Sequence, residues 1–122
     1  MTQEYIKGDI VMYDNKVMVV KEPRDGSHFD LSCPKEGLVY CLVDVNEIKP
    51  VSLTIAILEK NGWSKGQIYF RHSRIPRIKL CTDGGVSWSV SINNDIMGSY
   101  INYVHQLQHI LFAFDIGEEM EV

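Results

Sequence analysis

The sequence lacks the long apolar runs that mark membrane and secreted proteins. No stretch approaches the ~18 consecutive apolar residues of a membrane-spanning helix. The first nine residues carry Glu4, Lys7 and Asp9 and no apolar run, so no signal peptide is expected. These features together predict a cytoplasmic protein.

Cysteine is scarce, and its number is odd. Cys33, Cys41 and Cys81 follow no spacing typical of a disulfide framework, which is usually dense and even-numbered. We therefore predict three reduced thiols, at least partly buried, in a reducing compartment.

Catalytic signatures are also missing. The sequence contains no G-x-S-x-G nucleophile motif, no phosphate-binding P-loop and no dinucleotide fingerprint. His105 and His109 stand four residues apart, at the spacing of a metal pair on one helix face. Gln106 occupies the position at which zinc peptidases carry a general-base Glu, and no third ligand is evident. We expect two solvated or interface histidines, no metal, no cofactor and no enzyme, with a metal-dependent hydrolase as a distant alternative.

What is present suits a small globular protein. The chain has 122 residues, of which 45% are hydrophobic and 23% charged, so a packed core is expected and disorder is not. Lys49-Pro50 divides it into a β-barrel-like half, residues 1–50, and an αβββα half, residues 51–122. We expect the halves to pack as one compact unit.

The first half alternates short apolar segments with turn residues. Strands are predicted at Ile10–Tyr13, Val17–Lys21, Phe29–Cys33 and Leu38–Val45, with a tight hairpin at Asp14-Asn15. Both parities of the last segment are apolar, which predicts a strand buried on both sides. This density of strands favours a small SH3-like barrel.

The second half predicts a helix, three strands and a longer helix. Thr54 caps the first helix and Gly62 ends it. Strands are expected at Gln67–His72, Arg77–Thr82 and Val86–Asn93, the last two joined through Asp83-Gly84-Gly85.

Side-chain parity predicts which face of these strands is buried. The inward residues are expected to be Ile68, Phe70, Ile78, Leu80, Val86, Trp88, Val90 and Ile92. A helix over residues 100–114 is expected to cover them with one apolar arc, made of Tyr100, Tyr103, Val104, Leu107, Ile110, Leu111 and Phe114. The fold class is therefore α+β: an N-terminal small SH3-like β-barrel, a short helix, and a three-stranded antiparallel sheet covered by a C-terminal helix.

Positive charge is concentrated in one segment. The net charge is −4, yet residues 60–82 carry six cations and no acid. The basic hairpin 65–79 is the candidate contact surface, and its contact residues would be Lys65, Tyr69, Arg71, Arg74, Arg77 and Lys79. Solvated or internally paired cations, a nucleic acid, and an acidic protein partner all fit this pattern. A second surface, made of Ile101, Gln108 and Phe112 on the long helix, suits internal packing or a subunit contact.

Two segments resemble a family of small proteins. Residues 103–120 read YVHQLQHILFAFDIGEEM, and the segment ending at Trp63 reads EIKPVSLTIAILEKNGW. Both are similar to motifs in small uncharacterised proteins of Bacteroides-type gut bacteria, their phages and mobile elements. This chain differs at Ile55, Ala56 and His109, among other positions. The resemblance implies an order of elements and a mobile-element context, and no activity, substrate or catalytic residue.

The sequence therefore predicts a non-catalytic binding module of phage or mobile-element origin. An unidentified protein is the first expectation for its partner. The alternative is a weak nucleic-acid binder that uses the basic hairpin, and no membrane role is expected.

Overall fold

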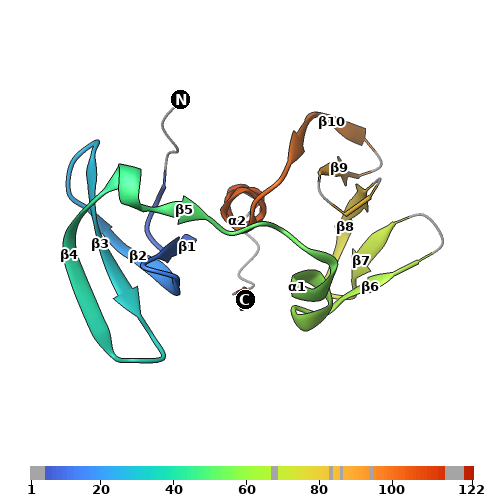
Figure 1. Cartoon of the computed structure of the whole chain (residues 1–122). Helices are drawn as coiled ribbons and strands as arrows, with labels where there is room; N and C mark the ends of the chain where they lie inside the picture. The colour runs from blue at the N-terminus through green and yellow to red at the C-terminus, as the bar shows by residue number, and fades with distance from the viewer. Residues whose placement is uncertain (1–4, 67–68, 83, 86, 94, 115–119) are drawn as a thin grey trace. The chain divides into compact units, whose positions relative to one another are not determined.

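The structure is a computed structural model that describes residues 5–66, 69–82, 84–85, 87–93, 95–114 and 120–122. The chain divides into two compact units, Met1–Val51 and Ser52–Val122. Each unit contains one five-stranded antiparallel sheet, and both α-helices belong to the second unit (Figure 1). The described residues are thus mostly β, with two open sheets and two α-helices.

The first unit is a meander whose last strand returns to the first. Its strands are β1 (Ile10–Tyr13), β2 (Lys16–Pro23), β3 (His28–Cys33), β4 (Leu38–Asp44) and β5 (Lys49–Pro50). They lie in the order β4-β3-β2-β1-β5, and a 3-10 turn, η1 (Val45–Glu47), separates β4 from β5. The four predicted strands are confirmed, and β5 is an addition.

The first hairpin follows the turn chemistry that the sequence predicts. Tyr13 pairs with Lys16, which leaves a two-residue loop at Asp14 and Asn15. Their φ angles are 52° and 60°, the left-handed values of a type I′ turn, which Asn and Asp tolerate better than most residues. Local sequence alone therefore sets the register of β1 against β2.

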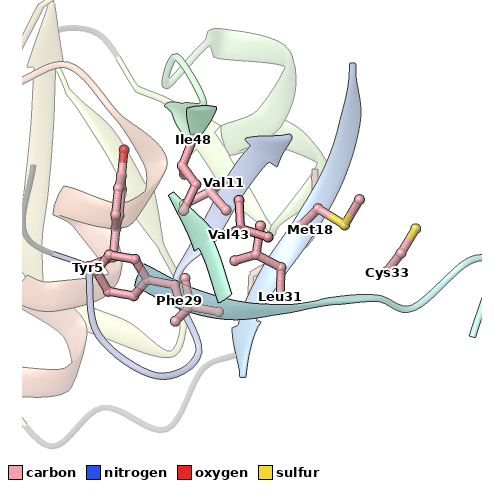
Figure 2. Close-up of a cluster of buried hydrophobic side chains, with 9 residues drawn as sticks. Tyr5, Val11, Met18, Phe29, Leu31, Cys33, Val43 and Ile48 are labelled. Carbon is pink, nitrogen blue, oxygen red and sulfur yellow. The ribbon is translucent and has the colours of Figure 1, made fainter. Parts of the chain in front are cut away.

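One face of this sheet carries the core of the first unit. The buried cluster consists of Tyr5, Val11, Met18, Val20, Phe29, Leu31, Cys33, Val43 and Ile48 (Figure 2). Tyr5 and Phe29 meet edge to face, with ring centroids 5.8 Å apart. Burying each large side chain contributes about 1.5–3 kcal/mol of transfer free energy, so this cluster stabilises the fold of the first unit.

The prediction of a fully buried β4 is wrong. Leu38, Val39 and Leu42 are 47%, 47% and 61% exposed. The physical reason is topology, because β4 forms an edge of an open sheet and, among the described residues, pairs only with β3. Since β4 and β5 are the two edges of this sheet, the closed barrel that the sequence suggested is not confirmed.

A β-bulge interrupts β4. Phe29 pairs with Val43 and Leu31 with Tyr40, so two residues of β4 stand opposite the single residue Asp30. One of them, Leu42, has a φ of 54°. Its backbone N–H donates to Oδ1 of Asp30 over 2.9 Å, and this bond fixes the bulge.

The same buried carboxylate holds an arginine. The Arg24 guanidinium contacts Oδ2 of Asp30 at 2.6 Å and 2.7 Å through two nitrogens. The bond from Arg24, followed by the bond from the Leu42 N–H, lowers the pKa of Asp30. Asp30 is therefore a charged anchor that joins β3, β4 and the residues following β2.

The second unit contains five strands and two helices. In chain order they are α1 (Ile55–Lys60), β6 (Trp63–Lys65), β7 (Phe70–His72), β8 (Ile75–Thr82), β9 (Trp88–Ile92), β10 (Asp95–Ile101) and α2 (Val104–Ala113). The sheet order is β10-β9-β8-β7-β6. Sequence reasoning found the three central strands and α1, and it missed β6 and β10. Part of the predicted first strand, Gln67 and Ile68, lies outside the described residues, as do Asp83 and Val86.

The predicted inward parity of the central strands is confirmed. Phe70, Ile78, Leu80, Trp88 and Val90 are all buried. Phe70 and Trp88 meet edge to face at 5.3 Å, and the Trp88 indole N–H donates to the Leu53 carbonyl over 2.9 Å. One face of the sheet is thus an apolar core, and the opposite parity faces outward.

The start of α1 is confirmed as well. The Thr54 hydroxyl accepts the Ile57 N–H over 3.2 Å. The helix ends at Lys60, Asn61 is its C-cap, and Gly62 follows with a φ of +88°. Figure 1 shows α1 next to β6, which continues directly from this turn.

His72 holds the turn after α1. Its Nδ1 accepts the Arg74 N–H over 3.0 Å, so Nε2 carries the proton and donates to the Asn61 carbonyl, also over 3.0 Å. A Cβ built on Gly62 would lie 2.8 Å from this Nε2. Gly62 is therefore required both for its backbone angle and for the space it leaves to His72.

The long helix begins later than predicted. Tyr100 belongs to β10, where it is 68% exposed, and α2 starts at Val104. Val104, Leu107 and Leu111 are buried, so the central part of the predicted arc is confirmed. Phe112 is 76% exposed, so internal packing, one of the two alternatives that the sequence left open for it, is not observed.

Candidate functional site

The outer face of the second sheet carries a row of cations between serines. The register joins Ser64 to Arg71, Arg71 to Lys79, Lys79 to Ser91, and Ser91 to Ile96. Directly opposed residues of an antiparallel sheet point to the same side, so these residues form one row across five strands. We call it the cation row, and it consists of Ser64, Arg71, Lys79, Ser91 and Ile96.

A second row on the same face ends in tyrosines. Cys81 pairs with Ser89, and Ser89 pairs with Tyr100. Tyr69 precedes Phe70, which pairs with Leu80, so the register places Tyr69 level with Cys81. We call Tyr69, Cys81, Ser89 and Tyr100 the tyrosine row. Tyr69 is 38% exposed and Tyr100 68% exposed, so both rings are accessible.

One contact joins the two rows. The Lys79 ammonium lies over the Tyr69 ring, 5.1 Å from its centroid. The attraction between the ammonium and the face of the ring favours one position of the Tyr69 side chain. The Gly66 N–H donates to the Tyr69 carbonyl over 2.7 Å, which holds the backbone next to this ring. Tyr69 is thus positioned by both its backbone and its side chain.

The described acids of this unit belong to other parts of it. They are Glu59, Asp95 and Glu121. Glu59 lies in α1, and the Glu121 backbone N–H bonds to Asn61 Oδ1 over 2.7 Å. Asp95 is paired with Ile92 and therefore has the opposite parity from the two rows. The charged members of the two rows, Arg71 and Lys79, are both cations.

The other predicted contact residues do not join these rows. Lys65 pairs with buried Phe70 and so has the inward parity, although it is exposed at the sheet edge. Arg74 is exposed in the turn between β7 and β8. The Arg77 guanidinium lies 5.6 Å from the ring centroid of Phe114, just beyond α2. Of the six predicted residues, Tyr69, Arg71 and Lys79 belong to the two rows, and Arg77, two residues before Lys79 in β8, shares their outward parity.

Sequence reasoning misses Tyr100, Ile96 and Ser64. Tyr100 fits the apolar arc of a helix, because its spacing to Tyr103, Val104 and Leu107 matches a helical period. β6 has three residues, too few for a visible alternation, and the register of β10 shifts between Ile96 and Tyr100. A bulge of this kind breaks the period-two pattern by which a strand is recognised.

The two helix histidines are not equivalent. His105 is 2% exposed, stacks on Tyr103 at 5.9 Å, and meets the His109 ring at 5.5 Å. Burial, with a smaller contribution from His109, lowers the pKa of His105 to about 4. Of the two settings expected for the helix histidines, solvated or at an interface, the solvated one is wrong for His105, and its side chain is neutral at pH 7.

Metal-binding residues do not gather in the described part of the chain. No group of three or more His, Cys, Asp or Glu side chains there is arranged to hold a metal ion. The three cysteines are free: Cys33 is buried, Cys81 is half-buried, and Cys41 is exposed. Cys41 is exposed because it lies on the edge strand β4, so the prediction that all three thiols are at least partly buried is wrong for this residue.

No protein-family model, curated protein or solved structure matches this chain significantly. None of the described helices has the length and apolar character needed to cross a bilayer. Any functional conclusion therefore rests on the geometry of the outer face.

Proposed function

We propose that the protein is a non-catalytic binding module that holds a polyanionic partner on the outer face of its second sheet. The carrying observation is that Arg71 and Lys79 are directly paired on an open sheet face, in a row whose only charges are positive. Like charges placed opposite each other destabilise a sheet by a few tenths of a kcal/mol or more.

The sequence favours an unidentified protein as the first partner and nucleic acid as the second. Cations alone do not separate an acidic protein segment from a nucleic acid. The exposed rings of Tyr69 and Tyr100 favour the second, because every base offers a face on which an aromatic ring can stack. We therefore prefer nucleic acid as the partner. An acidic protein is the competing hypothesis that the experiments must exclude.

Three finer expectations belong to the same proposal. The strand order β4-β3-β2-β1-β5 supports an SH3-like module that is open at its edges. The buried Val104, Leu107 and Leu111 support a role for α2 in covering the inner face. The resemblance of residues 103–120 supports a phage or mobile-element origin within a bacterial cytoplasm.

Retention on immobilised heparin tests the polyanion proposal. Heparin is a flexible polyanion without bases, so it reports the charge of the surface and not the stacking. We expect the double variant Arg71→Ser/Lys79→Ser to elute at clearly lower salt than the wild type. The matched control, Lys7→Ser/Lys35→Ser, removes the same charge from exposed positions of the first unit and is expected to elute close to the wild type. Equal loss of retention in both variants would show that only net charge matters, and would refute the proposed surface.

A further inference from the structure

We propose that the outer face binds single-stranded nucleic acid, with phosphates along the cation row and bases stacked on Tyr69 and Tyr100. This inference rests on the proposed polyanion-binding function and specifies its ligand. It follows from the spacing of the two rows, the exposure of the two rings, and the small side chains between them.

The tyrosines lie at opposite ends of the tyrosine row. Tyr69 precedes β7 and Tyr100 lies in β10, so three interstrand spacings separate them. Each spacing is about 4.8 Å, which puts the two positions about 14 Å apart across the sheet. Two bases of one strand can therefore stack at the same time, without being neighbours in sequence.

The cation row runs alongside the tyrosine row. Arg71 lies two residues beyond Tyr69, and Lys79 lies two residues before Cys81, so the rows are about 6–7 Å apart along the strands. A polynucleotide has the same division, with its charged backbone displaced to one side of its bases. The cation row thus corresponds to the phosphate backbone and the tyrosine row to the bases. Both rows run across the strands, so a polynucleotide lying across the sheet can follow both of them.

The residues between the rings are small. Cys81 and Ser89 separate the tyrosines, and Ser91 continues the cation row. The Ser89 hydroxyl donates to the Cys81 carbonyl over 3.3 Å, so toward a ligand its oxygen acts as an acceptor, for example of a base N–H or a sugar hydroxyl. Short side chains allow a ligand to lie close to the sheet, and the hydroxyl of Ser91 in the cation row is of the kind that donates to phosphate oxygens.

The exposed rings also distinguish single strands from duplexes. In a duplex the faces of the bases are already stacked on one another, so a tyrosine gains little from them. An acidic peptide pairs with Arg71 and Lys79 but has no flat face for Tyr100. Only an unpaired nucleic acid strand uses both rows.

Fluorescence polarisation with a labelled oligo-thymidine tests this inference. The same oligomer annealed to oligo-adenosine provides the duplex, and unlabelled polyglutamate provides the acidic polypeptide as a competitor. The variants are Tyr100→Ala, Tyr100→Phe, which keeps an aromatic ring, and Phe112→Ala, which removes an exposed ring from α2. Because Tyr100 and Phe112 are both largely exposed, these variants are expected to keep the fold, which far-ultraviolet circular dichroism checks.

We expect tighter binding to the single strand than to the duplex. Tyr100→Ala should weaken single-strand affinity roughly 5- to 150-fold, the range for loss of one stacked base. Tyr100→Phe and Phe112→Ala should bind as the wild type does. Arg71→Ser/Lys79→Ser should reduce the salt dependence, by about 0.7 per lost phosphate contact in the slope of log affinity against log salt.

Two results would overturn the inference and leave the polyanion proposal in place. One is an equal affinity for single strand and duplex that Tyr100→Ala does not change. The other is the absence of oligonucleotide binding at low salt while heparin still retains the wild type and polyglutamate binds it. If the wild type bound neither the oligonucleotides nor immobilised heparin, the polyanion proposal itself would be refuted.

Discussion

Single residues with left-handed or buried polar geometry determine several local structures of this protein. Some of them are readable from the sequence: Thr54 caps α1 and Asn15 turns the first hairpin, because in both cases the bonding partner is a few residues away. Leu42 is not readable, since its φ of 54° depends on the carboxylate of Asp30, twelve positions earlier. Residue-scale prediction succeeds where the interaction is local in sequence.

Gly62→Ala is expected to destabilise the second unit strongly. The left-handed angle costs about 1–2 kcal/mol for a residue with a Cβ, and the contact with His72 adds to it, so we expect a loss of at least about 2 kcal/mol. Urea denaturation measures the change. Gly84→Ala is the matched control, because Gly84 has a φ of +97° and nothing lies within 4 Å of the position that a Cβ would take there. In a His72→Ala background the cost of Gly62→Ala should fall to that of the control, and an unchanged cost would refute the steric explanation.

Burial of His105 predicts a specific pH dependence of stability. Its pKa is about 4 in the folded chain and ordinarily 6.5, so the unfolded chain binds more protons between these values. The free energy of unfolding should therefore fall as the pH is lowered from about 6.5 to about 4, by up to about 3 kcal/mol. Denaturation at pH 7 and pH 5 measures this. His105→Gln should flatten the dependence, and an identical dependence in wild type and variant would contradict the assignment.

Asp30 is expected to stabilise the first unit only while it is charged. Asp30→Asn keeps an oxygen for the Leu42 N–H but removes the ion pair with Arg24, so the denaturation midpoint should fall at pH 7. The pKa of Asp30 is lowered in the folded state, so its contribution is present above 3.8 and is lost as the pH falls through the folded value. Wild type and variant should converge in strong acid. A constant difference down to the lowest pH would argue against an ionic contribution.

At the scale of elements, long regular patterns are predictable and short or interrupted ones are not. The alternation of residues 86–93 identifies β9 and its buried face, and a tight turn identifies β1 and β2. β10 resembles the start of a helix because its bulge disrupts the strand period. The apolar run in β4 suggests a buried strand, whereas its exposure depends on its edge position, which is a property of the whole sheet.

A substitution at the bulge in β4 is expected to stabilise the protein. Leu42 is 61% exposed and left-handed, so Leu42→Asn loses little burial and relieves backbone strain. We expect a gain of about 0.5–1 kcal/mol in unfolding free energy, which is part of the roughly 1–2 kcal/mol of strain, because Asn tolerates this angle better than Leu but still carries a Cβ. Val39→Asn is the matched control, because Val39 is exposed on the same strand and has no such angle, and it should be neutral or destabilising. A loss of stability in Leu42→Asn would mean that the side chain, and not the backbone, matters at this position.

At the scale of the whole molecule, the sequence predicts the uneven distribution of charge but not its arrangement in space. Six cations in residues 60–82 mark the segment. Only the register of five strands shows that Arg71 and Lys79 stand side by side, that Lys65 has the opposite parity, and that Arg77 lies at Phe114. It also brings Tyr100 onto the same face from a strand about thirty positions later in the chain. Tertiary pairing of this kind has no signal in a single sequence.

Amide chemical-shift mapping tests the central claim most directly. Titration of an isotope-labelled protein with oligo-thymidine at low salt should shift the resonances of Arg71, Lys79, Ser89 and Tyr100 first, and leave β1 to β5 unaffected. Shifts confined to the first unit, along the exposed edge strand β4, would contradict the account, because they would place binding on a surface that has neither the cation row nor the tyrosine row.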